Sequence, residues 1–175
     1  MLRLLLATLL TVSCIYVSAQ PRPPAAEHEV KAAYLYQFGR YVEWPSEDPA
    51  GSSFVICVLG KDPFGVALNE IVNGKIISGH PVATKRILRP SEVQDCRILF
   101  VSSSEDDRLR AILRALEGRT VLTVGEGTQF TQQGGMVGFV SADRKVRFVV
   151  NLAAAEAEKL KLSSELLRLA VSVQQ

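Results

Sequence analysis

The sequence contains few of the residues that build catalytic and metal sites. Its 175 residues include only two histidines and three cysteines. His28 and His80 do not have the spacing of a metal-binding pair, and no nucleophile elbow or paired-cysteine motif occurs. We therefore predict a protein that is not an enzyme and that binds neither a metal ion nor a cofactor.

An excess of charge of one sign is also missing, because 20 basic residues face 18 acidic ones. Nucleic acids and anionic membranes are recognised through a strongly basic surface, so this balance argues against both as partners. Basic residues do gather locally, for example at Arg144, Lys145 and Arg147. Acidic residues interleave with most such clusters, which predicts a solvated surface.

The sequence lacks a complete phosphate-binding loop. Residues 60–65 lie between a predicted strand and a predicted helix, where a glycine-rich loop can hold phosphate. However, Val66 and Ala67 occupy the places where a Walker loop needs lysine and a hydroxyl residue. Asp62 occupies the place of the middle glycine of the dinucleotide fingerprint. The loop is therefore interpreted as a simple strand-to-helix turn.

The only leader-like apolar run is at the N-terminus, and it is too short for a stable membrane span. Residues 1–19 combine Arg3, an apolar stretch and the end Val17-Ser18-Ala19, which is typical of a secretory signal peptide. We expect cleavage after Ala19 and a soluble periplasmic product, since the residues before Cys14 match a lipoprotein site poorly. Residues 20–26 form a proline-rich lead that we expect to be flexible, and residues 27–175 form one domain.

Two cysteines, Cys57 and Cys96, remain after cleavage. Disulfides persist in exported proteins, which favours a bond between them. In the loop-entropy model a bond at this separation would stabilise the fold by about 4 kcal/mol. The alternative is two buried apolar thiols, because Cys57 lies in the middle of a strand pattern.

The hydrophobic pattern predicts strands alternating with helices. Residues 54–59, 98–101 and 120–124 are apolar runs that suit strands covered on both faces, with shorter extended pieces at 76–78 and 82–88. Helices are predicted from Pro63 to Val72 and after the capping residues 102–104. Short connections of this kind favour right-handed crossovers and a parallel sheet.

The C-terminal part has a different pattern. Residues 136–140 and 146–150 have the spacing of an antiparallel hairpin. Asn151 is expected to cap a short helix, and Ser163 a final helix whose Leu166, Leu169 and Val173 pack inward. The predicted fold is thus an α/β three-layer sandwich with a mostly parallel, Rossmann-like or flavodoxin-like sheet and a C-terminal antiparallel hairpin.

The first predicted helix, which starts near Glu27 and ends before Pro45, has an aromatic face. Tyr34, Phe38, Tyr41 and Trp44 follow one another at three- and four-residue steps. Such a stripe indicates either core packing or an exposed recognition surface, and helical spacing favours the core.

Several motifs in register resemble the YfiR/HmsC family of periplasmic proteins, over nearly all of residues 28–173. The stretches that carry the likeness are VKAAYLYQF (30–38), VEWP (42–45), ICVLGKDPFG (56–65), CRILF (96–100), VLTV (121–124), GGMV (134–137), RFVVNL (147–152) and LKLSSELLRLA (160–170).

The resemblance implies a repressor of cyclic di-GMP signalling. Such proteins bind the periplasmic part of an inner-membrane diguanylate cyclase and hold it inactive, until an OmpA-like outer-membrane lipoprotein sequesters them. Family members are commonly homodimers, and Cys57 and Cys96 match family cysteine positions.

The resemblance transfers no contact residues, so the partner surface is a separate hypothesis. We select the aromatic first helix and the hairpin around Phe139 and Phe148, because apolar aromatics beside a sheet edge suit docking. The alternative function is an extracytoplasmic small-molecule sensor, with the strand ends around residues 60–65 lining a pocket.

Overall fold

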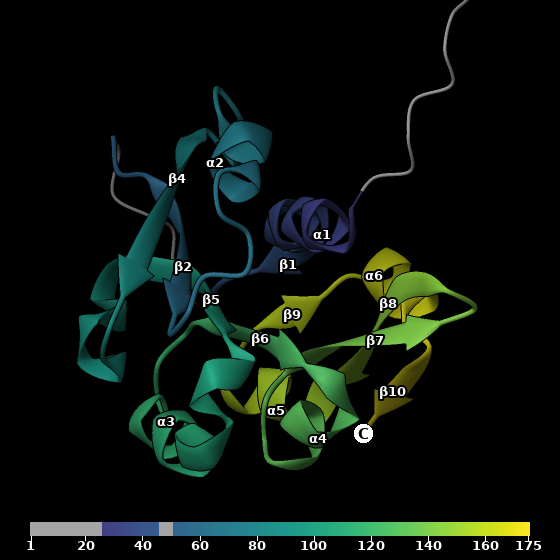
Figure 1. Ribbon diagram of the computed structural model, residues 1–175. Helices are drawn as coiled ribbons and strands as arrows, with labels where there is room; N and C mark the ends of the chain where they lie inside the picture. The colour runs from purple at the N-terminus through teal and green to yellow at the C-terminus, as the bar shows by residue number, and fades with distance from the viewer. Residues whose placement is uncertain (1–25, 46–50) are drawn as a thin grey trace, which may run out of the picture.

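The structure is a computed structural model that describes residues 26–45 and 51–175. The predicted signal peptide, Cys14 and nearly all of the predicted lead lie outside these residues. An eight-stranded mixed sheet with the order β10-β8-β7-β6-β5-β2-β4-β3 forms the centre, and a two-stranded sheet pairs β1 with β9. The large sheet is curled like half a barrel, with helices on both sides (Figure 1).

The strands of the large sheet are mostly parallel, as predicted. Their bounds are β2 (Phe54–Leu59), β3 (Ile76–Ile77), β4 (His80–Ile87), β5 (Cys96–Val101), β6 (Leu122–Glu126), β7 (Val137–Ala142), β8 (Lys145–Asn151) and β10 (Ser172–Gln174). Within this sheet, as residues 26–45 and 51–175 form it, the β3–β4 and β7–β8 pairs are antiparallel and the other pairs are parallel. The inner order β4-β2-β5-β6-β7 is the flavodoxin-like order 2-1-3-4-5.

Helices connect these strands. Their bounds are α1 (Glu27–Tyr41), α2 (Ala67–Val72), α3 (Leu109–Ala115), α4 (Gly127–Gln132), α5 (Leu152–Ala157) and α6 (Ser164–Leu169), with 3₁₀ turns η1 (Pro90–Asp95) and η2 (Ser103–Arg108). The small sheet is formed by β1 (Val42–Glu43) and β9 (Lys161–Leu162). In Figure 1, α1 and α2 lie on one side of the large sheet and α3 and α4 on the other.

The alternation of side chains along the central strands creates two cores. In β2, Ile56 and Val58 point into the larger core, between the sheet and α1. Cys57 and Leu59 point into the smaller core, between the sheet and α3. All four are completely buried. Continuous apolar runs are therefore required here, and the predicted three-layer α/β sandwich is confirmed.

The first helix is shorter than predicted. The apolar pattern suggested that it continues to Trp44, but α1 ends at Tyr41 and Val42 begins the strand β1. Val42 pairs with Leu162, and the backbone N–H of Ser163 donates to the carbonyl of Tyr41. This long-range pairing, which a helical pattern cannot reveal, ends the helix one turn early.

Three apolar residues placed in predicted helices lie elsewhere or face solvent. The helix predicted from Pro63 begins only at Ala67, and Val66, which its apolar pattern put on the buried side, precedes it and is 70% exposed. Leu169 is 53% exposed at the end of α6, and Val173 belongs to the edge strand β10 instead of a helix. Leu166 is buried as expected.

Helix α4, which was not predicted from the sequence, is held by a phenylalanine between glycines. A Cβ atom at Gly125 or at Gly135 would collide with the ring of Phe130, so the ring packs where both neighbours lack a side chain. Gly134 has φ +106°, a conformation that favours glycine, so the two glycines before β7 allow a positive φ at one position and a close approach at the other.

Candidate interaction surface

Helix α1 and the β7–β8 hairpin, the two predicted contact elements, lie together in the structure. The ring of Tyr34 lies 5.5 Å from that of Phe148 and 6.0 Å from that of Phe139. Phe38 makes similar contacts, at 5.1 Å to Phe148 and 5.9 Å to Phe139. These aromatic contacts fix the helix against the strands.

The aromatic cluster is mostly core. Phe38, Phe139 and Phe148 are at most 1% exposed, so their rings have no surface for a partner. Tyr34 and Tyr41 are half-buried and pack against the edge of this core. Of the six residues selected as a candidate partner surface, only Tyr34, Tyr41 and Trp44 therefore offer accessible atoms.

Trp44 lies apart from this cluster, beyond the C-terminal end of α1. Its ring packs edge-on against Phe54 at 5.2 Å. Its indole N–H is buried and has no hydrogen-bond partner among residues 26–45 and 51–175.

A groove of about 580 Å³ separates the N-terminal half of α1 from the hairpin. The residues that line it are Glu27, Val30, Tyr34, Val140, Ser141, Arg144, Lys145, Val146 and Arg147. Both walls belong to elements selected from the sequence for their aromatic residues. Tyr34 itself lines the groove, whereas on the hairpin the lining residues are neighbours of Phe139 and Phe148. The alternation that buries Phe139 and Phe148 could not reveal which neighbours the groove exposes.

The hairpin turn is tighter than the five-residue connection expected from sequence. Ala142 pairs with Lys145, leaving only Asp143 and Arg144 in the turn. Their φ values of +52° and +58° are those of a type I′ turn, which matches the twist of the two strands. Arg144 therefore adopts a conformation that favours glycine or asparagine, at the outermost point of the hairpin.

Lys31 links α1 to the end of β6. Its Nζ lies 2.6 Å from Glu27 and donates to both carboxylate oxygens of Glu126 at 2.9 Å. Burial disfavours the charged ammonium, but the hydrogen bonds to Glu27 and Glu126 outweigh burial and raise the pKa of Lys31. The hydrogen bond and charge of Lys31 lower the pKa of Glu27.

The two cysteines form a disulfide, as predicted. Cys57 in β2 and Cys96 at the start of β5 have Cα atoms 5.8 Å apart, and the bond joins neighbouring central strands. Both side chains are buried in the smaller core, so the bond is shielded from solvent.

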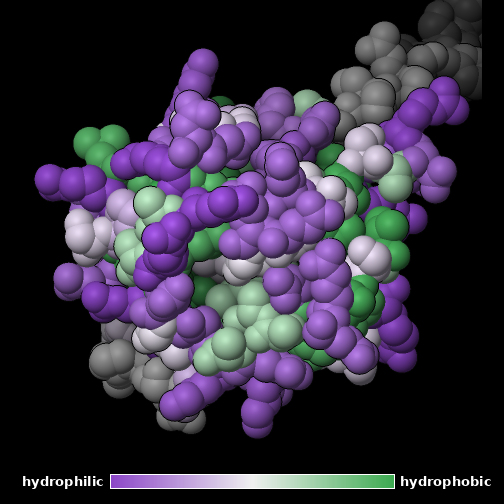
Figure 2. Space-filling model, turned by 90° about the horizontal axis from the view of Figure 1, so that it is seen from below, coloured by the Kyte–Doolittle hydropathy of each residue, from purple (hydrophilic) through white to green (hydrophobic). Residues whose placement is uncertain are grey.

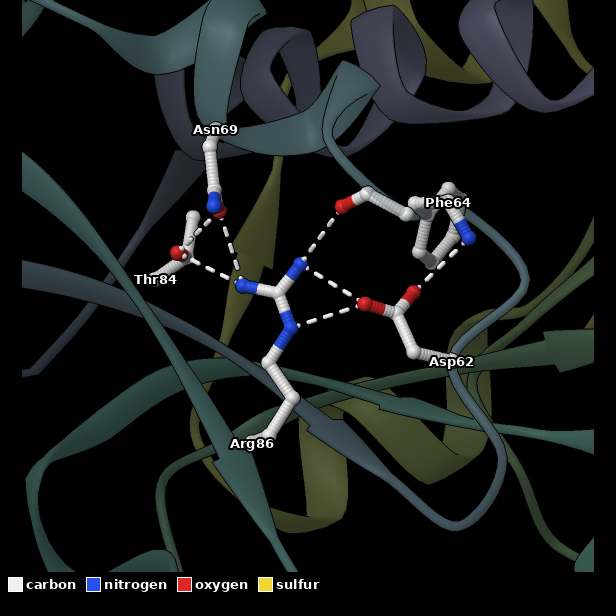
Figure 3. Close-up of polar contacts among 6 residues, drawn as sticks. Asp62, Phe64, Asn69, Thr84 and Arg86 are labelled. Carbon is white, nitrogen blue, oxygen red and sulfur yellow. Dashed lines mark hydrogen bonds and ion pairs between the residues drawn. The ribbon is translucent and has the colours of Figure 1, made fainter.

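The loop after β2 is fixed by one arginine and is not an open phosphate cradle. Arg86 of β4 donates to Asp62 through Nε at 2.8 Å, and its Nη2 lies 2.7 Å from the same carboxylate (Figure 3). Its other contacts reach Asn69, Thr84 and the carbonyl of Gly65. Since these contacts use the guanidinium on all sides, Arg86 holds the loop against the strand.

Side chains also fill the point between β2 and β5 where the strand order reverses, the usual ligand crevice of this topology. A Cβ atom at Gly60 would lie 2.6 Å from Ser104 Oγ and from Glu105 Oε1. Ser104 Oγ accepts the backbone N–H of Lys61 at 2.9 Å, and the carboxylate of Glu105 pairs with Arg108. The crevice is therefore closed by the protein itself.

A second cavity, of about 420 Å³, lies between α3, α4 and α5. Arg110, Arg114 and Arg119 line it together with Glu117 and Glu158. The face seen from below in Figure 2 is mostly hydrophilic, with apolar side chains exposed between polar ones. An arginine at the C-terminal end of a helix complements the helix dipole, which accounts for Arg114 without a ligand.

Residues 26–45 and 51–175 contain no group of three histidine, cysteine or acidic side chains arranged to hold a metal ion. No helix in this part of the chain combines the length and apolar character of a membrane span.

The fold and these sites define a disulfide-linked α/β protein with a mostly parallel sheet covered on both faces. The sequence pattern of the YfiR/HmsC-like family matches residues 28–171, and the chain belongs to this family, whose members regulate diguanylate cyclases. No curated protein matches the sequence.

A similar fold occurs in the crystal structure of a conserved domain protein from Vibrio cholerae O1 biovar El Tor. The TM-score is 0.55 with 12% sequence identity, over 84% of this chain. This chain spans 60% of the length of the Vibrio protein. At this identity, the likeness supports the fold alone.

Proposed function

We propose that this protein is exported to the periplasm and represses an inner-membrane diguanylate cyclase by binding its periplasmic part. The single observation that carries the proposal is the family match over residues 28–171. An OmpA-like outer-membrane lipoprotein is the partner proposed to remove the repressor from the cyclase.

The disulfide supports an extracytoplasmic location. Bonds of this kind persist in the periplasm and are rare in the reducing cytosol. The Cys57–Cys96 bond joins two neighbouring inner strands of the sheet, and an oxidising compartment would keep it formed.

Repression requires a preference between two states of the cyclase. A ligand with equal affinity for active and inactive conformations shifts no equilibrium, however tightly it binds. Holding a population at 99% inactive against an initial 1% requires about 10⁴-fold tighter binding to the inactive state. The protein needs a specific contact surface for this, and no reactive group of its own.

The alternative of a small-molecule sensor relied on the loop 60–65 as a pocket wall. In the structure Asp62 is held by Arg86, and Ser104 and Glu105 occupy the space at Gly60. These contacts leave the sensor hypothesis without the site on which it depended, and they favour the repressor.

The proposal is tested by measuring intracellular cyclic di-GMP in a strain that lacks this protein. We expect the level to rise, and to return when the complete chain is supplied from a plasmid. A chain lacking residues 1–19, which would remain in the cytoplasm, serves as the matched control and should not restore it. Unchanged cyclic di-GMP in the deletion strain, with the cyclase present, would contradict the proposal.

Homodimer formation is a further part of the proposal. It is supported by the family resemblance alone. Sedimentation equilibrium of the purified exported chain measures it directly. A mass of twice the chain is expected, and a monomer at micromolar concentration would contradict it.

A further inference from the structure

The groove between α1 and the β7–β8 hairpin carries positive charge without internal compensation. Arg144, Lys145 and Arg147 line it from the hairpin. Among residues 26–45 and 51–175, none of the three forms an ion pair or a side-chain hydrogen bond. Their charges are therefore available to a partner.

The acidic residues nearby do not neutralise this rim. Glu27, the one acidic residue in the lining, is already paired with Lys31 at 2.6 Å. Asp143 in the turn is exposed and forms no ion pair among the described residues. The sequence pattern predicted that interleaved acidic residues balance most basic clusters. At this cluster they do not, and the rim has a net positive charge.

The floor of the groove is apolar. Val30, Tyr34 and Val146 are half-buried, and Tyr34 and Val146 pack against the larger core. Further apolar surface lies between the end of α6 and the edge strand β10, where Leu169 and Val171 are 53% and 55% exposed. The N–H of Val171 donates to the carbonyl of Phe148 at 2.9 Å, which places this edge directly beside the hairpin strand.

An apolar floor beside unpaired basic side chains fits one kind of occupant. We propose that this groove binds a segment of the protein partner that carries acidic side chains next to an apolar one. The apolar side chain is buried over Tyr34 and Val146, and the acidic groups face Arg144, Lys145 and Arg147. The inference rests on the proposed function, which makes the periplasmic part of the cyclase the source of this segment.

The turn geometry allows charge to be removed without loss of the fold. Replacing Arg144 by glycine removes a positive charge and creates Asp-Gly, the preferred sequence of a type I′ turn. Because φ at this position is +58°, glycine is less strained there than arginine. The Arg144→Gly variant should have a thermal midpoint at or above that of the wild type, so a loss of binding cannot be attributed to unfolding.

The experiment measures binding of the full-length cyclase, solubilised in detergent, to the immobilised protein at two salt concentrations. Arg144→Gly combined with Lys145→Glu should weaken binding at least about tenfold at low salt, mainly through slower association. Binding of the wild type should also weaken as salt is raised, because the surface charges are screened. The matched control Arg110→Gly/Arg114→Glu changes the same charges on α3, beyond the opposite face of the sheet, and should bind normally.

Two results separate the inference from the function on which it rests. Equal, salt-independent cyclase binding by wild type and hairpin variant would overturn the groove inference and leave the repressor proposal intact. Absence of any binding by the wild type would overturn both. Binding to vesicles of anionic phosphatidylglycerol is measured in parallel. If the hairpin variant lost vesicle binding but kept cyclase binding, the occupant would be a lipid surface and the inference would be contradicted.

Discussion

Cys57 and Cys96 join β2 and β5, two neighbouring inner strands of the sheet, with Cα atoms 5.8 Å apart and with both side chains buried. β2 and β5 are also the strands between which the chain order reverses. The bond therefore crosses the point where the two halves of the fold meet.

Removing this bond should lower stability strongly. For a separation of 39 residues, we expect the Cys57→Ala/Cys96→Ala variant to lose about 4 kcal/mol. This corresponds to a fall of about 10 °C in the thermal midpoint. Calorimetry of the oxidised wild type and the variant measures the difference. A fall below about 2 °C would show that the bond contributes little.

The buried rings of the aromatic cluster, Phe38, Phe139 and Phe148, should behave as core and not as a contact surface. Phe148 is completely buried, so Phe148→Ala is expected to destabilise the fold by about 3–5 kcal/mol. Tyr34→Phe keeps the ring and should change stability by less than about 0.5 kcal/mol. Urea titration of both variants tests this, and a mild Phe148→Ala variant would contradict the packing.

Alanine substitutions at Gly60 and Gly65 test whether side chains close the crevice between β2 and β5. Both have positive φ, but a Cβ atom added at Gly60 would meet Ser104 and Glu105, whereas one added at Gly65 would meet nothing within 4 Å. Gly65→Ala should therefore cost about 1–2 kcal/mol for the left-handed backbone alone. Gly60→Ala should cost about 1–3 kcal/mol more through overpacking. Equal midpoints in urea would indicate open space at Gly60 and would support the ligand pocket of the sensor hypothesis.

The Glu27–Lys31 pair predicts a small, pH-dependent contribution to stability. Because Lys31 lowers the pKa of Glu27, the contribution is present above the ordinary glutamate pKa of about 4.3 and is lost as the pH falls through the lowered value. The thermal midpoint of Glu27→Gln should thus lie slightly below that of the wild type at pH 7. The two midpoints should converge near pH 2, and a difference that grows with acidification would contradict the pairing.

The regular part of the fold could be predicted from the sequence because that part is specified locally. β2 and residues 98–101 of β5 are unbroken apolar runs. Asn151 and Ser163 cap α5 and α6 as expected, and their side chains accept backbone N–H groups at 3.0 and 3.2 Å. The hairpin was recognised from the spacing of its two strands. These signals lie within a few residues of each other along the chain.

The errors occurred where distant segments decide the structure. Val42 left the helix because it pairs with Leu162, and the edge strand β10 formed because Val173 pairs with Val150. Neither partner is visible in a local pattern. The contact hypothesis stays a prediction, but it included Phe139 and Phe148, which are buried because they pack against the distant helix α1.

The activity of the cyclase itself provides the most direct test of repression. Membranes that contain the full-length diguanylate cyclase would be supplied with GTP, and cyclic di-GMP formation would be measured while the purified exported protein is added. We predict that synthesis falls in a saturable manner and recovers when the protein is washed away. Synthesis that stays constant at saturating protein, under conditions where the cyclase is active, would contradict the central claim.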